Sequence, residues 1–242
     1  MEEGEKGKSA LAWLQSRNKL GGVPFWESLE GIERGEWYFP SAHFKAMLRY
    51  SLCAPLLDVT GRVISNCRCC EADKGVAVNI EGHYTHPMGC PSVSNYSLRH
   101  NDVRDYLESL LKRYSIRDGN GPMAVTTKEV TVHEGENGVG NVVMDIVYRE
   151  QAHRQRVIYV DVAVVDPGAP TYVAGRSHEQ PGAAAAAREA DKMSSFRQRV
   201  PEFQDADSLF YAFVVESTGR LGERARSFLR DVVGARDIHV RA

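Results

Sequence analysis

The run VIYVDVAVV, residues 157–165, limits the possible folds more than any other stretch of the sequence. It is apolar and rich in β-branched residues, which is typical of a strand buried in the centre of a sheet. Its one charged residue is Asp161. A lone carboxylate in such a strand would cost several kcal/mol unless a partner compensated it. We therefore expect a sheet built around this run, with a cation beside Asp161.

A second strand-like run, NVVMDIVY at residues 141–148, carries Asp145 in a similar mid-strand position. If the two strands are neighbours, Asp145 and Asp161 can lie on one face of the sheet. Side chains alternate along a strand, so we expect Asp145 to share its face with Val143 and Val147. The pair of acids then becomes a candidate functional site.

The remaining pattern predicts an α+β protein with the order helix, three strands, helix, strand, helix. Short connections between the three strands favour an antiparallel meander. The alanine-rich run favours a helix on propensity alone. The elements expected are a helix that begins at Asn101, strands at residues 125–134, 141–148 and 157–165, a helix at 183–199, a strand at 209–216 and a helix at 217–233.

Two adjacent carboxylates are the hard oxygen ligands that Mg²⁺ or Mn²⁺ prefers, and phosphodiester hydrolysis also needs a cation near the attacked phosphate. Lys192, on the predicted alanine-rich helix, can orient the nucleophile or stabilise phosphate charge. Glu189, one turn earlier, is a candidate extra ligand or a partner for that lysine. The alternative is structural, because a strand aspartate can pair with an arginine and a helical lysine usually lies on the surface.

Four of the five cysteines lie within residues 67–90, a clustering that favours a metal site over a disulfide framework. A Cys-x2-Cys pair places two thiolates on one turn, and a later His and Cys can complete a tetrahedron around Zn²⁺. The expected ligands are Cys67, Cys70, His86 and Cys90. Cys69 can replace either of the first two, and His83 can replace His86. Such a zinc is expected to be structural, and the alternative is a group of buried free thiols.

The overall composition is ordinary for a globular protein, with 26% charged and 43% hydrophobic residues. No apolar run approaches the roughly 20 residues needed to cross a bilayer, so we expect no membrane partner. The net charge of −2 argues against a protein that coats nucleic acid uniformly, but it is compatible with a local basic groove. Arg99 and His100 are candidate contacts to DNA phosphate or to the active site, and a structural histidine is the alternative.

These motifs together resemble a known family. Cys-x2-Cys, His, Cys, then RHN, YVDVAVVDP, AREADKMSSF and VVESTGRLG occur in the order found in the C-terminal region of site-specific non-LTR retrotransposon proteins. There a zinc knuckle precedes a restriction-like endonuclease of the PD-(D/E)XK superfamily. The resemblance implies that Asp145 and Asp161 match the metal-binding acids, and that Lys192 matches a lysine moved from the strand to the following helix. Met144 stands where the family has proline, and Phe196 lies near a frequent tyrosine.

The resemblance implies a restriction-endonuclease-like core at residues 99–242, a zinc knuckle at 61–98, and a tail with a helical segment at 1–60. It implies a nuclear, Mg²⁺- or Mn²⁺-dependent enzyme that nicks DNA, with RNA as the alternative substrate. It also implies a reverse transcriptase segment of a longer polyprotein as a partner. Too few residues precede position 40 to hold that segment, so we expect an excised fragment or a free-standing relative. The alternative function is a catalytically inactive, domesticated nucleic-acid- or protein-binding module on the same fold.

Overall fold

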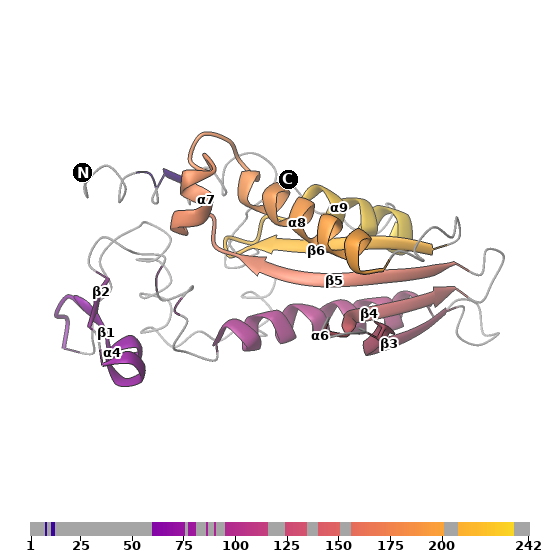
Figure 1. Ribbon diagram of the computed structural model, residues 1–242, viewed down its shortest axis with the longest axis horizontal. Helices are drawn as coiled ribbons and strands as arrows, with labels where there is room; N and C mark the ends of the chain where they lie inside the picture. Colours follow the sequence, from indigo (N-terminus) through magenta and orange to yellow (C-terminus); the bar gives the residue numbers. More distant parts are fainter. Residues whose placement is uncertain are drawn as a thin grey trace, which may run out of the picture.

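The fold was analysed from a computed structural model, shown in Figure 1. It describes residues 8, 11–12, 60–75, 77–80, 86, 90, 95–115, 124–134, 140–150, 156–200 and 208–234. The predicted helical segment before residue 60 therefore falls almost entirely outside the described residues. Within the described residues, no helix is both long and apolar enough to cross a membrane.

The main sheet has four strands in the order β3-β4-β5-β6. Their bounds are β3 (Ala124–His133), β4 (Val142–Glu150), β5 (Val157–Val165) and β6 (Ser208–Glu216). The first three strands pair antiparallel, which confirms the predicted meander. The pairing of β6 with β5 is parallel, so the chain must cross over between them. The crossover contains α7 (Pro170–Ala174) and α8 (Ala183–Arg199), and the protein is of mixed α+β class.

Helices cover both faces of this sheet. One core packs α6 (Asn95–Ser115) and α9 (Glu223–Phe228) against β4, β5 and β6. The second core packs α8 against the opposite face, and Figure 1 shows the sheet between α6 and α8. Both faces of β5 are thus buried, which explains its nearly continuous apolar sequence. Burying one such valine or isoleucine contributes about 1.5–3 kcal/mol.

The side-chain alternation of β4 shifts at Asp145. Val142 and Met144 pack in the α8 core, whereas Ile146 and Tyr148 pack in the α6 core, although all four are separated by even numbers of residues. On β3, the facing position between the paired residues is Glu129, whose φ is 51°. A left-handed conformation is uncommon for a residue other than glycine and here coincides with the change of face. In both strands, the side chains at even-numbered positions therefore change from one face of the sheet to the other at this point.

This shift corrects the expected surroundings of Asp145. Val147 is buried in the α8 core, but Val143 is 48% exposed, so the two do not share one buried face with the acid. The pairs between β4 and β5 run from Arg149↔Val157 to Ile146↔Val160. Asp145 is consequently the first residue of β4 beyond that pairing, at the point where the two strands diverge.

The helix before the sheet also differs from the prediction. It begins at Asn95, not at Asn101, so a domain boundary at residue 99 would fall inside it. Asn101 has a strong N-cap preference, so local preference alone placed the start of the helix too late. The last helix, α9, begins at Glu223 and passes at Leu229 into a π-helical turn, η2 (Leu229–Gly234).

The cysteine-bearing segment is small and separate from the sheet. It consists of β1 (Asn66–Cys67), α4 (Arg68–Lys74) and β2 (Val78–Asn79), with β1 and β2 antiparallel. Gly75 ends α4 with a φ of 65° and donates its N–H to the carbonyl oxygen of Glu71. This left-handed C-cap favours glycine because a Cβ would be strained there.

Candidate active site and metal centre

Asp161 and Lys192 form a close ion pair between the sheet and α8. Asp161 lies on the β5 face that also carries Tyr159 and Ala163, and this face packs on α8. The Lys192 Nζ is 2.6 Å from the Asp161 Oδ1, and the two side chains are 12% and 25% exposed. The sequence-predicted pair of acid and lysine is thus brought together.

Asp145 is held by contacts from two other elements. Its Oδ2 accepts the Val162 backbone N–H at 2.6 Å, so a side chain satisfies a donor of β5 where the regular ladder has ended. The same oxygen accepts a hydrogen bond of 3.1 Å from the His100 Nε2 on α6. The Asp145 side chain is 16% exposed. These contacts fix the carboxylate at the divergence of β4 and β5.

The two carboxylates are close enough to affect each other's pKa values, which are shifted in opposite directions. Burial raises the pKa of Asp161, the neighbouring Asp145 raises it further, and Lys192 opposes both. Burial also acts to raise the pKa of Asp145, but the hydrogen bonds from His100 and Val162 outweigh it and lower that pKa. The bond to Asp145 raises the pKa of His100, against the effect of burial. Two acids in contact require a cation or a shared proton.

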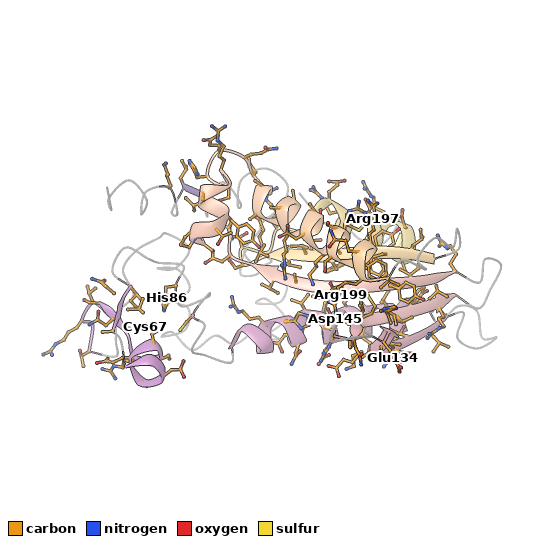
Figure 2. All side chains as sticks on the ribbon, viewed as in Figure 1. Cys67, His86, Glu134, Asp145, Arg197 and Arg199 are labelled. Carbon is orange, nitrogen blue, oxygen red and sulfur yellow. The ribbon has the colours of Figure 1, made fainter. Side chains whose placement is uncertain are left out.

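A pocket of about 590 Å³ opens beside this ion pair. One wall is residues 141–144 of β4 and the segment before it, and the other is α8. Arg199 joins the two walls, because its guanidinium donates to the carbonyl oxygens of Gly140 at 2.7 Å and Asn141 at 2.9 Å. Figure 2 shows Asp145 and Arg199 in this region between α6 and α8. Asp161, which lines the pocket, is therefore reachable from outside.

Glu189 has a different position from the one predicted. Its buried Oε1 accepts the backbone N–H of Arg224 at 2.9 Å, in the first turn of α9. A Cβ added at Gly222 would lie 2.1 Å from the same oxygen, so a larger residue there would displace the Glu189 carboxylate. A carboxylate at a helix N-terminus is stabilised by the unpaired N–H groups. The described contacts of Glu189 are with α9, and we assign it to that helix terminus rather than to the acid pair.

A second buried glutamate, Glu216, likewise accepts a backbone N–H at a helix N-terminus, that of α8. Its Oε1 accepts the Ala185 N–H at 3.1 Å, and its Oε2 is 3.9 Å from the Arg220 Nε. The side chain is fully enclosed. This contact fixes the start of α8, and through it the position of Lys192 relative to β5.

Of the two residues predicted to contact nucleic acid, His100 lies against Asp145 and is part of the acid site. Arg99 is its neighbour on α6 and is partly buried. The proximity of His100 to Asp145 required the earlier start of α6, which adds more than one helical turn before Asn101. His100 therefore orients an acid, whatever else it contacts.

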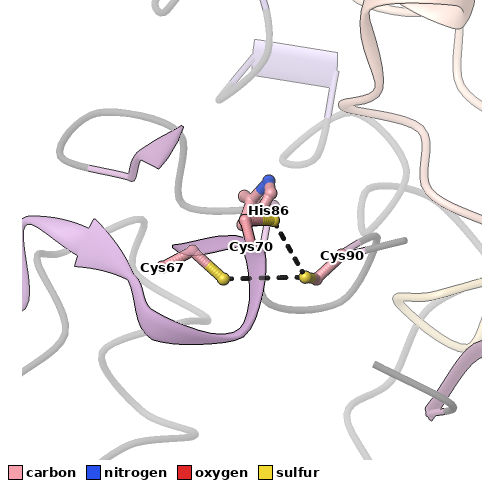
Figure 3. A group of neighbouring side chains, drawn as sticks. All are labelled: Cys67, Cys70, His86 and Cys90. Carbon is pink, nitrogen blue, oxygen red and sulfur yellow. Dashed lines mark hydrogen bonds between the residues drawn. The ribbon is translucent and has the colours of Figure 1, made fainter. Parts of the chain in front are cut away.

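The four predicted zinc ligands converge, as Figure 3 shows. The ligand atoms of Cys67, Cys70, His86 and Cys90 all lie within 4.8 Å of one another. The Cys90 Sγ is 3.6 Å from that of Cys67 and 3.4 Å from that of Cys70, and the His86 Nε2 is 3.5 Å from the Cys70 Sγ. A tetrahedron with Zn–S bonds of 2.3 Å has S···S edges of about 3.8 Å. The cluster could bind a metal such as zinc.

The structure also narrows the alternatives for this cluster. Cys69 is exposed and outside it, whereas His83 lies outside the described residues. The described cysteines are all free thiols. Burial opposes ionisation of Cys67, but hydrogen bonds from the backbone of Cys70 and the side chain of Cys90 lower its pKa overall. A lowered thiol pKa favours the thiolate that a metal requires.

Fold and site together define a mixed α+β protein with a paired-acid site on its sheet and a Cys₃His cluster in a small separate segment. No protein-family model matches the chain, and no curated protein matches it. The function is therefore argued from the geometry of these two sites.

Proposed function

We propose that this protein is a divalent-metal-dependent DNA endonuclease with a restriction-like core of the PD-(D/E)XK type. The observation that carries the proposal is the meeting of Asp145 and Asp161 at the divergence of two strands, with the Lys192 amine from α8 beside them. Neighbouring carboxylates repel each other, so their placement together favours a bound cation. Lys192 supplies one positive charge in this structure, and we propose that a divalent ion supplies it during the reaction.

The topology and the sequence resemblance support the same proposal. The order α6, β3, β4, β5, α8, β6, with an antiparallel meander and one parallel strand, fits the core expected for this superfamily. By the same resemblance we propose a relationship to retrotransposon endonucleases, a reverse transcriptase segment as partner and a nuclear location. RNA is the alternative substrate.

The donor set fits Mg²⁺ or Mn²⁺, because both candidate ligands are carboxylates and both are partly exposed. Asp145 and Asp161 would hold the ion. The bound ion would supply Lewis-acid stabilisation of the phosphate and a more acidic water. His100 orients Asp145 through its hydrogen bond, as residues behind a metal ligand commonly do. Lys192 supplies positive charge for the attacked phosphate.

We assign the Cys₃His cluster a structural zinc. Four protein ligands leave no open coordination position for a substrate. In a segment with strands of only two residues each, the metal would replace a hydrophobic core.

The proposal is tested by incubating purified protein with supercoiled plasmid. We expect conversion to the open-circular form with Mg²⁺ or Mn²⁺, and no conversion with EDTA. The readout is the fraction of nicked plasmid against time on an agarose gel. Equal conversion with and without EDTA, or none at any divalent-metal concentration, would contradict the proposal.

Two observations favour the rival function, a binding module without catalysis. Lys192 already neutralises Asp161, with their charged atoms 2.6 Å apart. Phe196 lies near a position where the retrotransposon family often has tyrosine, and here it is buried and stacked on Phe210. If this rival is correct, the protein retards DNA or another partner on a gel and leaves it intact with every metal.

A further inference from the structure

The pocket beside Asp161 contains an arginine that the proposed chemistry does not use. Arg188 lines it from α8, four residues before Lys192, and is partly buried. In the part of the chain that the structure describes, no carboxylate pairs with Arg188. The more buried Arg104 does have such a partner, because its guanidinium pairs with Glu129. The hydrogen-bond donors of the Arg188 guanidinium therefore remain available to a ligand that enters the pocket.

The charges that face the pocket favour an anionic ligand. Three cations line it, and of its two acids one is already paired with a cation. The cations are Arg188, Lys192 and Arg199, and the acids are Asp161 and Asp191. Arg199 is committed to two backbone carbonyls of the opposite wall. Arg188 is therefore the cation left to meet an incoming anion.

The spacing of Arg188 and Lys192 matches a nucleic-acid strand. Residues four apart lie on the same side of a helix, and the axial rise between them is about 6 Å. One DNA strand carries a phosphate about every 3.4 Å along the duplex axis. A strand whose scissile phosphate lies at Asp161 and Lys192 would thus bring a phosphate one or two nucleotides away to Arg188. A planar guanidinium can bind two phosphate oxygens at once.

We propose that Arg188 binds a backbone phosphate next to the scissile one and so sets the path of the cleaved strand along α8. This inference rests on the proposed function, since it assumes that the scissile phosphate lies at Asp161. It adds that the substrate enters between α8 and the start of β4. Because the contact is to phosphate, it holds the strand without reading its sequence.

The matched control is Arg197, on the same helix. Nine residues separate it from Arg188, which places the two on opposite sides of α8, and Arg197 lines a different groove together with Arg224. Figure 2 shows Arg197 on the side of α8 away from Asp145. Replacing either arginine with glutamine removes one positive charge. Any difference in DNA affinity between the two variants is therefore due to the position of the charge on α8.

The experiment compares wild type, Arg188→Gln, Arg188→Lys and Arg197→Gln. Affinity for a fluorescent duplex of random sequence is measured by anisotropy with Ca²⁺ at several salt concentrations, and KM and kcat are measured by nicking with Mg²⁺. For Arg188→Gln we expect about tenfold weaker binding and a similar rise in KM, as loss of one charge-assisted contact predicts. The slope of log K against log[salt] should fall by about one, while kcat stays within about threefold. The affinity and KM of Arg188→Lys should lie between those of wild type and Arg188→Gln, and those of Arg197→Gln should match wild type.

An Arg188→Gln protein with wild-type affinity and salt slope would overturn the inference, as would an equal loss in Arg197→Gln. Matching thermal melting curves exclude misfolding, and Arg188→Lys keeps the test valid if the glutamine variant is unstable. If wild type binds duplex through Arg188 but never nicks it, the phosphate contact stands and the proposed catalysis fails. If wild type binds no DNA, both are overturned.

Discussion

Asp161→Asn is expected to lower Mg²⁺-dependent plasmid nicking by at least about 10³-fold. Asparagine keeps the size of the side chain but removes one of the two carboxylates that would hold the ion. Metal stabilisation of the transition state is worth several kcal/mol, and each 1.36 kcal/mol corresponds to a factor of ten in rate. The measurement is the initial nicking rate at saturating Mg²⁺. Asp145→Asn should show a loss of the same order.

The control for this prediction is Asp231→Asn. Asp231 is exposed on η2 and accepts a hydrogen bond of 2.9 Å from the Tyr211 hydroxyl, in a different part of the fold. Its replacement should leave the nicking rate within about twofold. Far-UV circular dichroism and a melting curve show whether Asp161→Asn is folded. A folded Asp161→Asn protein that nicks at the wild-type rate would refute the catalytic assignment.

Cys70→Ser is expected to remove zinc from the protein. Cys70 is one of two buried members of the cluster and contacts both Cys90 and His86, and serine is a poor ligand for this metal. A structural zinc site of this kind contributes about 10–16 kcal/mol of apparent binding free energy, so its loss should unfold the surrounding segment. We expect about one zinc per wild-type chain and close to none in the variant, measured by mass spectrometry of the metal. Protease cleavage should become rapid near residues 67–90.

The neighbouring Cys69 provides a matched control, because it is exposed and outside the cluster. Cys69→Ser should keep one zinc per chain and the wild-type cleavage pattern. Retention of zinc by Cys70→Ser, or its loss from Cys69→Ser, would contradict the assignment of ligands.

Local sequence patterns were sufficient to predict several parts of the structure. Strand β5 follows from a long β-branched run, which has few alternatives to a buried strand. The convergence of Cys67, Cys70, His86 and Cys90 follows from ligand spacing, because a short turn already places the first two together. The helical position of Lys192 follows from the strong propensity of the alanine run before it.

Other features depend on contacts between distant segments, which a local pattern does not contain. The change of face at Asp145 accompanies the left-handed Glu129 on the neighbouring strand, and neither residue type signals it. The hydrogen bond from His100 to Asp145 joins residues 45 positions apart. Glu189 caps a helix that begins 34 residues later, so its spacing from Lys192 suggested a role that its contacts do not support. Arg188, proposed above as a phosphate contact, had one signal in the sequence, its four-residue spacing from Lys192.

The central claim is that Asp145 and Asp161 together hold a divalent cation. Its most direct test is a crystal structure of the protein soaked with Mn²⁺, with the ion located by anomalous scattering. The account predicts one Mn²⁺ with carboxylate oxygens of both residues at about 2.1 Å, and the Lys192 amine displaced from its 2.6 Å contact with Asp161. No anomalous peak at saturating Mn²⁺, with the Lys192–Asp161 pair still closed, would contradict it.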